Sequence, residues 1–135
     1  MAIAWTEALA VGDATIDADH RRMVELINEL EDAAAALPVD CRRAGRALDG
    51  LRSFTADHFA REEALQQAVG LPDRDAHADK HRMLLQRLDA LADHFSRSDD
   101  EVRAGMVRGL ADPLATWLAE HIANSDVELR AYIRR

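Results

Sequence analysis

The sequence predicts an all-α protein, an up-down-up-down four-helix bundle with an N-terminal arm, on three observations. Apolar residues recur at steps of three and four along four segments, as amphipathic helices require. Short polar turns join these segments, which makes neighbouring helices antiparallel. No segment has the alternating pattern of a strand. Because 135 residues fit the usual size of one domain, we expect a single domain over residues 1–135.

The first two helices are predicted over about residues 16–37 and 41–69, after an N-terminal arm of residues 1–15 that Trp5 anchors on the bundle. Pro38 separates the two helices because proline cannot continue a helix. The inward stripe of the first helix comprises Ile16, His20, Met23, Ile27, Leu30, Ala34 and Leu37. The stripe of the second comprises Ala44, Leu48, Leu51, Phe54, His58, Glu62, Leu65 and Val69. Each stripe therefore places a histidine among core positions.

The last two helices are predicted over about residues 73–95 and 99–133. The turn sequence Gly70-Leu71-Pro72-Asp73 precedes the third helix, and polar residues 96–100 separate it from the fourth. Pro113 predicts a bend within the fourth helix. The two inward stripes comprise His77, His81, Leu84, Leu88, Leu91 and Phe95, and then Val102, Met106, Leu110, Leu114, Trp117 and His121.

Composition and charge exclude several classes of protein. Cys41 is the only cysteine, so neither an intrachain disulfide nor a metal site made of several thiolates can form. The net charge of −8 argues against a surface for nucleic acid or for an anionic membrane. The N-terminal residues lack a basic start, and no apolar run is long enough to span a bilayer. We therefore expect a cytoplasmic protein without nucleic-acid or membrane partners; a protein partner is not identifiable from the sequence.

Five histidines lie on the predicted inward stripes and come from all four helices: His20, His58, His77, His81 and His121. A single histidine on such a stripe is more often a core residue whose hydrogen bonds are satisfied. Burying five without partners costs about 1–3 kcal/mol for each unsatisfied group, and a shared metal centre removes that cost. His94 lies about 220° around the helix from His81, so we expect it on the surface.

Carboxylates extend the predicted metal site. Glu62 shares the face of His58, one turn on, whereas Glu63 falls outside this face and is expected to be a solvated charge. Asp126 lies about 140° around an ideal helix from His121, so spacing alone does not pair them. Five histidines and a carboxylate exceed the four ligands of one zinc ion and fit two metals better. Imidazole and carboxylate suit iron, copper, zinc or manganese, which leaves the element open.

In order and spacing, the segments IDADH (16–20), HFAREE (58–63), HADKH (77–81) and HIANSD (121–126) resemble the hemerythrin family, specifically the single-domain bacteriohemerythrins. The resemblance covers almost the whole chain. It implies reversible dioxygen binding at a non-haem di-iron centre whose two iron ions are bridged by carboxylates and a hydroxo or oxo group. The ligands that it implies are His20, His58, Glu62, His77, His81, His121 and Asp126, with Glu62 and Asp126 bridging the irons.

The resemblance leaves some features open. Gln66 stands where family members often carry methionine, and Leu71 where tyrosine is common. These departures affect packing near the site, and with it oxygen affinity and autoxidation, but neither residue is an implied ligand. We expect an apolar wall of Phe54, Leu84 and Trp117 beside the centre, and one position for dioxygen or, in the oxidised form, for a small anion such as azide.

The imidazole-rich ligand set favours a binding protein over an enzyme. Oxygen-activating di-iron enzymes on related bundles use carboxylate-rich sites with E-x-x-H motifs, and no E-x-x-H occurs here. We therefore expect oxygen storage, delivery or sensing rather than catalysis. Two alternatives remain at this point: a regulatory module that responds to oxygen or redox state through a partner, and a di-iron enzyme acting on peroxide or nitric oxide.

Overall fold

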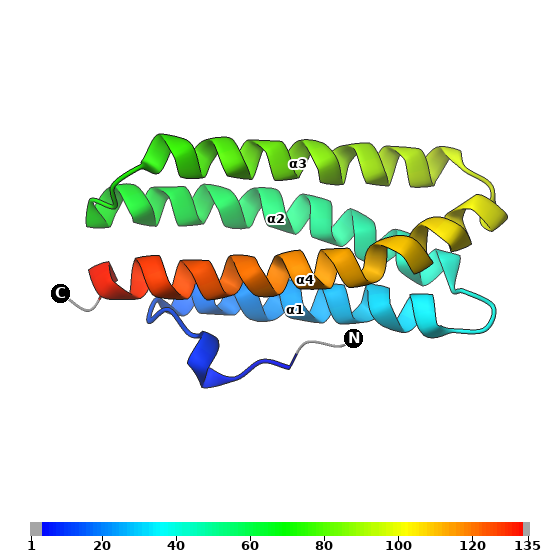
Figure 1. Ribbon diagram of the computed structural model, residues 1–135, viewed down its shortest axis with the longest axis horizontal. Helices are drawn as coiled ribbons and strands as arrows, with labels where there is room; N and C mark the ends of the chain where they lie inside the picture. Colours follow the sequence, from blue (N-terminus) through cyan, green and yellow to red (C-terminus); the bar gives the residue numbers. More distant parts are fainter. Residues whose placement is uncertain (1–3, 134–135) are drawn as a thin grey trace.

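Four helices and a short N-terminal turn make up the computed structural model, which describes residues 4–133 apart from the side chains of residues 125–127. The elements are η1 (Glu7–Leu9), α1 (Ala14–Ala35), α2 (Cys41–Val69), α3 (Arg74–Arg97) and α4 (Asp100–Ile133). Successive helices run antiparallel, and the N-terminal arm lies beside α1 and α4 (Figure 1). The described residues contain no strand, and the predicted fold class, a four-helix bundle, is confirmed.

Capping side chains and one glycine set the helix ends near the expected residues. The carboxylates of Asp13 and Asp40 accept hydrogen bonds from the backbone N–H groups of Ile16 and Arg43, 3.0 and 3.1 Å away, and so cap α1 and α2. Gly70 ends α2 with a φ of 72°, the left-handed conformation that glycine adopts without strain. α1 ends at Ala35, earlier than expected, so Leu37 is 95% exposed and was wrongly assigned to the core.

The N-terminal arm is fixed to the bundle by polar contacts. The carboxylate of Asp17 accepts hydrogen bonds from the N–H groups of Val11 and Gly12, at 2.7 and 3.3 Å. From α4, Arg130 donates to the carbonyl groups of residues 8 and 10. Trp5 contacts α1 as expected, because the guanidinium of Arg21 lies 4.9 Å from its ring centre.

Two apolar clusters bracket the middle of the bundle. The larger comprises Met23, Val24, Leu26, Ile27, Leu30, Ala33, Ala44, Ala47, Leu48, Leu51, Phe95, Val107, Ala111, Ala115, Leu118 and Ile122. The smaller, at the opposite end, comprises Val11, Ile16, Leu71 and Leu129, so Leu71 fills an apolar position. α1 packs closely on α2 and α4, and α2 packs on α3, but α3 and α4 touch only sparsely. The predicted histidine positions lie between the two clusters, where the α3–α4 side is the least closed.

The buried face of α4 differs from the predicted one. Its buried residues are Val107, Ala111, Ala115, Leu118, Ile122 and Leu129, whereas Val102 is exposed and Met106, Leu110, Leu114 and Trp117 are only partly buried. Small side chains on this face let α4 approach α1 closely, and the larger ones flank the contact. α4 remains helical through Pro113, and Figure 1 shows its N-terminal part bent relative to the rest. None of the helices within the described residues combines the length and apolar character needed to cross a bilayer.

Candidate metal centre

Three imidazoles converge on one carboxylate at the centre of the bundle. His20 of α1, His58 and Glu62 of α2, and His121 of α4 each offer a ligand atom, and these atoms lie within 4.8 Å of one another. The Nε2 atoms of His58, His121 and His20 are 2.9, 3.4 and 3.8 Å from Oε2 of Glu62. His20, His58 and Glu62 are almost completely buried. A group of this kind, with nitrogen and oxygen donors facing inward, can hold a metal ion.

Buried polar atoms in this group lack hydrogen-bond partners among the described residues. Both ring nitrogens of His20 are buried and make no hydrogen bond, and the buried Oε2 of Glu62 contacts only imidazole nitrogens of the same group. The Nε2 atoms of His58 and His121 face each other at 3.3 Å, and two neutral imidazole nitrogens can share only one proton there. Each unsatisfied buried group costs about 1–3 kcal/mol. A cation bound among these lone pairs removes that cost, so the residues fit a metal centre.

Glu62 carries the negative charge of this group. Burial raises the pKa of Glu62, but the neighbouring imidazoles of His121, His20, His58 and His81 outweigh burial and hold the pKa far below its usual range. Its other oxygen, Oε1, accepts a hydrogen bond from Nε2 of the buried Gln66 at 3.3 Å. Glu62 is therefore ionised at every physiological pH, and Gln66 fixes the orientation of its carboxylate.

His81 reaches the same carboxylate from α3. Its Nε2 atom lies 3.4 Å from Oε1 of Glu62, and its Nδ1 atom lies 3.0 Å from Oε2 of Glu63. Its ring stacks flat on Phe59, with centroids 3.7 Å apart and an interplanar angle of 3°. Burial lowers the pKa of His81, but Glu62 and Glu63 outweigh burial and raise it. The expectation that Glu63 is only a solvated charge is wrong, because Glu63 contacts a histidine of the site.

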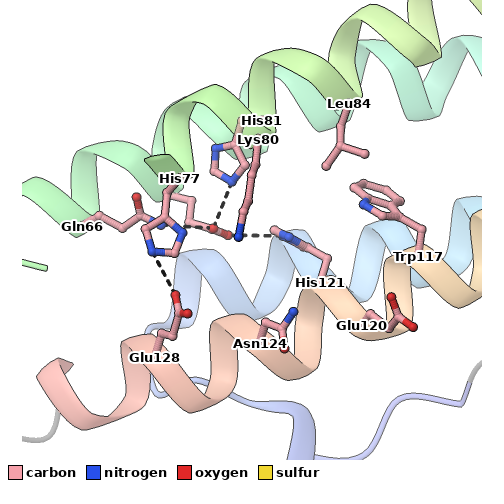
Figure 2. A pocket seen from close by; sticks show the side chains of 11 residues that line it. Gln66, His77, Lys80, His81, Leu84, Trp117, Glu120, His121, Asn124 and Glu128 are labelled. Atoms are coloured by element: carbon pink, nitrogen blue, oxygen red, sulfur yellow. Dashed lines mark hydrogen bonds and ion pairs between the residues drawn. The ribbon is translucent and has the colours of Figure 1, made fainter. Parts of the chain in front are cut away.

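His77 stands apart from this convergence. The Nε2 atom of His77 lies 3.0 Å from Oε2 of Glu128 on α4, and the His77 side chain is 21% exposed. Figure 2 shows this pair at the edge of the site, away from His121. The side chain of Asp126 lies outside the described residues, so its predicted part in the site stays a prediction. His94 is exposed, as its position on the helix predicts.

A cavity of about 150 Å³ opens between α3 and α4 onto Glu62, His81 and His121 (Figure 2). Leu84 and Trp117 face each other at one end of it, as expected for an apolar wall. Its remaining lining is mostly polar: Gln66, His77, Lys80, Glu120, Asn124 and Glu128. Phe54 does not line it, contrary to expectation, and instead lies 5.5 Å from the guanidinium carbon of Arg61. The cavity gives small polar molecules a route to the centre.

The carboxylate of Asp19, which contacts His58 on the side away from Glu62, was not predicted from the sequence. Oδ2 of Asp19 lies 3.1 Å from Nδ1 of His58, and the guanidinium of Arg61 donates two hydrogen bonds of 2.8 Å to the same carboxylate. Burial raises the pKa of Asp19, but the hydrogen bonds from Arg61 and His58 outweigh burial and lower it. The only signal in the sequence is the acidic residue next to a core histidine, because Arg61 is far along the chain.

Comparisons with known proteins agree on one family. The family model described as "Hemerythrin HHE cation binding domain" matches residues 11–133. The bacteriohemerythrin of Ralstonia nicotianae is 33% identical over 120 residues, which cover 89% of this chain and 80% of that protein. The bacteriohemerythrin of Pseudomonas aeruginosa is 31% identical over 124 residues, covering 92% of this chain and 76% of the relative.

A solved structure supports the same relationship. The crystal structure of a hemerythrin mutant superposes on this chain with a TM-score of 0.72 and 26% sequence identity. The superposition covers 96% of this chain and 99% of the other. The likeness therefore extends over the whole bundle and not only over the segments that carry the histidines.

Proposed function

This chain belongs to the hemerythrin family, and we propose that it binds dioxygen reversibly at a pair of iron ions held inside the bundle. The observation that carries the proposal is the convergence of three imidazoles on the buried carboxylate of Glu62, with donor atoms that have no other partner among the described residues. Family membership makes iron the metal to test first, since the ligand types alone fit several elements.

Seven residues are proposed to hold the two irons: His20, His58, Glu62, His77, His81, His121 and Asp126. Support for His20, His58, Glu62 and His121 comes from their grouping within 4.8 Å, and support for His81 from its 3.4 Å contact with Glu62. Joining the centre requires His77 to give up its contact with Glu128. The two carboxylates, Glu62 and Asp126, are proposed to bridge the irons, together with a hydroxo or oxo group.

The protein residues control what reaches the irons. When bound, the ferrous pair supplies the electrons on which reversible dioxygen binding depends. Leu84 and Trp117 shield one end of the cavity from water, and the indole of Trp117 stacks on His121 with ring centroids 5.8 Å apart. Tight packing around His20 and His58 blocks entry from the α1 side. Small ligands therefore enter between α3 and α4.

Binding is favoured over catalysis by the donor set. The histidines offer neutral donors, and neutral donors stabilise oxidised, high-valent iron less well than carboxylates do. Within the described residues, the cavity contains no nucleophilic serine, threonine or cysteine. Glu120 and Glu128 line its mouth but are exposed, which leaves them without the environment that tunes an acid or base for catalysis.

An optical oxygen titration of protein loaded with ferrous iron under nitrogen tests the proposal. We expect one dioxygen per iron pair, with a spectrum that returns to its starting form when oxygen is removed. An unreactive protein, or one that takes up oxygen without releasing it, contradicts reversible binding. Repeated turnover of oxygen or peroxide with added reductant identifies an enzyme instead.

A further inference from the structure

We propose that Asp19, clamped by Arg61, is a positioning residue that orients His58 and tunes it as a metal ligand. This inference rests on the proposed function, because it assumes that His58 binds iron. It concerns two residues outside the proposed ligand set, one on α1 and the other on α2. Its basis is a continuous chain of short contacts from the surface to the centre, from Arg61 through Asp19 to His58.

The geometry of this chain is well defined. Nε and Nη2 of Arg61 lie 2.8 Å from Oδ2 and Oδ1 of Asp19, a two-point contact that fixes the plane of the carboxylate. Oδ2 then lies 3.1 Å from Nδ1 of His58. Asp19 is only 5% exposed, so water does not compete for this oxygen. The clamp therefore holds the carboxylate against the back of the imidazole.

This contact determines which nitrogen of His58 faces the metal site. An ionised carboxylate accepts but does not donate, so Nδ1 of His58 carries the proton and Nε2 keeps its lone pair. Nε2 is the atom that lies 2.9 Å from Glu62 and 3.3 Å from His121. A carboxylate at the outer nitrogen also makes an imidazole a more basic ligand. Asp19 thus supplies both orientation and electron density to His58.

Neither His20 nor His81 has an equivalent support. His20 has no hydrogen-bond partner at either ring nitrogen among the described residues. His81 has a carboxylate at Nδ1, but the Glu63 side chain that provides it is 39% exposed. Water weakens such an exposed contact. Glu63 is therefore a matched control for Asp19, with the same kind of contact at nearly the same distance and without the burial.

The test compares Asp19→Asn with Glu63→Gln in protein loaded with ferrous iron under nitrogen. Iron affinity is measured by competition with a chelator, and the midpoint potential of the iron centre by redox titration. Asparagine keeps the shape but can turn its amide N–H toward Nδ1, which favours the wrong tautomer of His58. We expect Asp19→Asn to weaken iron binding about 10- to 100-fold. The midpoint potential should rise, because a less basic ligand stabilises ferric iron less.

Glu63→Gln should weaken iron binding less than threefold, because the contact of Glu63 with His81 is exposed to water. Arg61→Gln should weaken it several-fold, because the carboxylate of Asp19 remains but is no longer held by Arg61. Arg61 is on the surface side of the contact, so its variant serves if Asp19→Asn fails to fold. The inference is overturned if the folded Asp19→Asn protein, or the Arg61→Gln protein, has the iron affinity and the midpoint potential of the wild type. The contact between Asp19 and Arg61 would then be only a salt bridge between α1 and α2. A wild-type protein that binds no iron contradicts the proposed function itself.

Discussion

The two sides of the candidate centre are built differently. The closed side is formed by His20, His58 and Glu62 on α1 and α2, and these residues are almost completely buried. Behind it, Asp19 contacts His58 and is held by hydrogen bonds from Arg61. The open side, formed by His77 and His81 on α3, borders the cavity. His81 contacts Glu62, whereas His77 is paired with Glu128. The helices α1 and α2 pack closely, and α3 and α4 do not.

This difference separates two tasks of the proposed dioxygen-binding centre. Rigid packing on the closed side holds donor atoms in a fixed arrangement before metal binds, which reduces the reorganisation that binding requires. Sparse packing on the open side leaves a path for ligands. We therefore expect the closed side to bind metal without help from His77, and the open side to complete the pair.

The largest effect is expected from Glu62→Ala, which removes the carboxylate that all the converging imidazoles share. This variant should lose nearly all bound iron, because the imidazoles lose the carboxylate on which they converge and Asp126 is then the only carboxylate left in the proposed ligand set. Iron per chain, measured by elemental analysis after anaerobic loading, provides the test. Glu63→Ala is the adjacent control and should retain iron; equal loss in both variants contradicts the central role of Glu62.

A similarly large effect is expected from His20→Ala on the closed side. We expect this variant to retain little iron, while His94→Ala keeps the wild-type amount because His94 is exposed on the opposite face of α3. Both changes remove the same chemical group, so general effects of losing a histidine cancel. Iron retained by His20→Ala at the wild-type level would show that the closed side is not a ligand group.

Removal of iron should lower stability strongly. An occupied centre ties the helices together and satisfies buried donor atoms, and a metal bound at about 1,000 times its Kd contributes about 4 kcal/mol. For a chain of this size, we expect the melting temperature to fall by about 10 °C or more. Thermal melts followed by circular dichroism, with and without iron, measure the change. Equal melting temperatures contradict the account.

Azide binding should distinguish the open side from the closed side. In the oxidised, iron-loaded protein we expect azide to saturate at one per iron pair, because the proposed ligand set leaves one position open and small anions can approach the centre through the cavity of about 150 Å³. Trp117→Ala, which enlarges that cavity, should change the rate of azide binding more than its final stoichiometry. An optical titration that saturates at two azides per pair refutes a single open position.

The smallest effect is expected from Glu128→Gln. Its contact with His77 is half exposed, so its loss should change the free energy of unfolding of the iron-free protein by less than about 1 kcal/mol. Urea denaturation of the two proteins measures this difference. A loss of several kcal/mol indicates that the pair is a structural element of the bundle and that His77 does not leave it readily.

Much of the fold was predictable from sequence because helix periodicity and turn residues are local signals. Pro38 and Gly70 mark helix ends, and four stripes specify four helices. The buried face of α4 was predicted wrongly because the prediction favoured large apolar side chains, whereas the buried positions of this helix include the small residues Ala111 and Ala115.

Helix periodicity predicted which side chains of the candidate centre face the interior of the bundle. His20, His58, Glu62 and His121 do meet, because each stripe faces the same axis. The contacts behind the histidines were not predictable. Asp19 and Arg61 are 42 residues apart in sequence, and their pairing depends on how α1 and α2 are aligned along the bundle. The contact between His77 and Glu128 likewise depends on the alignment of α3 with α4.

The central claim is that the closed side binds one iron by itself and that the open side completes the pair. An anaerobic calorimetric titration of iron-free protein with ferrous ions tests it most directly, comparing the wild-type chain with His77→Ala. We predict two irons for the wild type, and for His77→Ala one iron bound with nearly wild-type affinity. Two irons bound with unchanged affinity by His77→Ala, or none at all, would contradict this division of the centre.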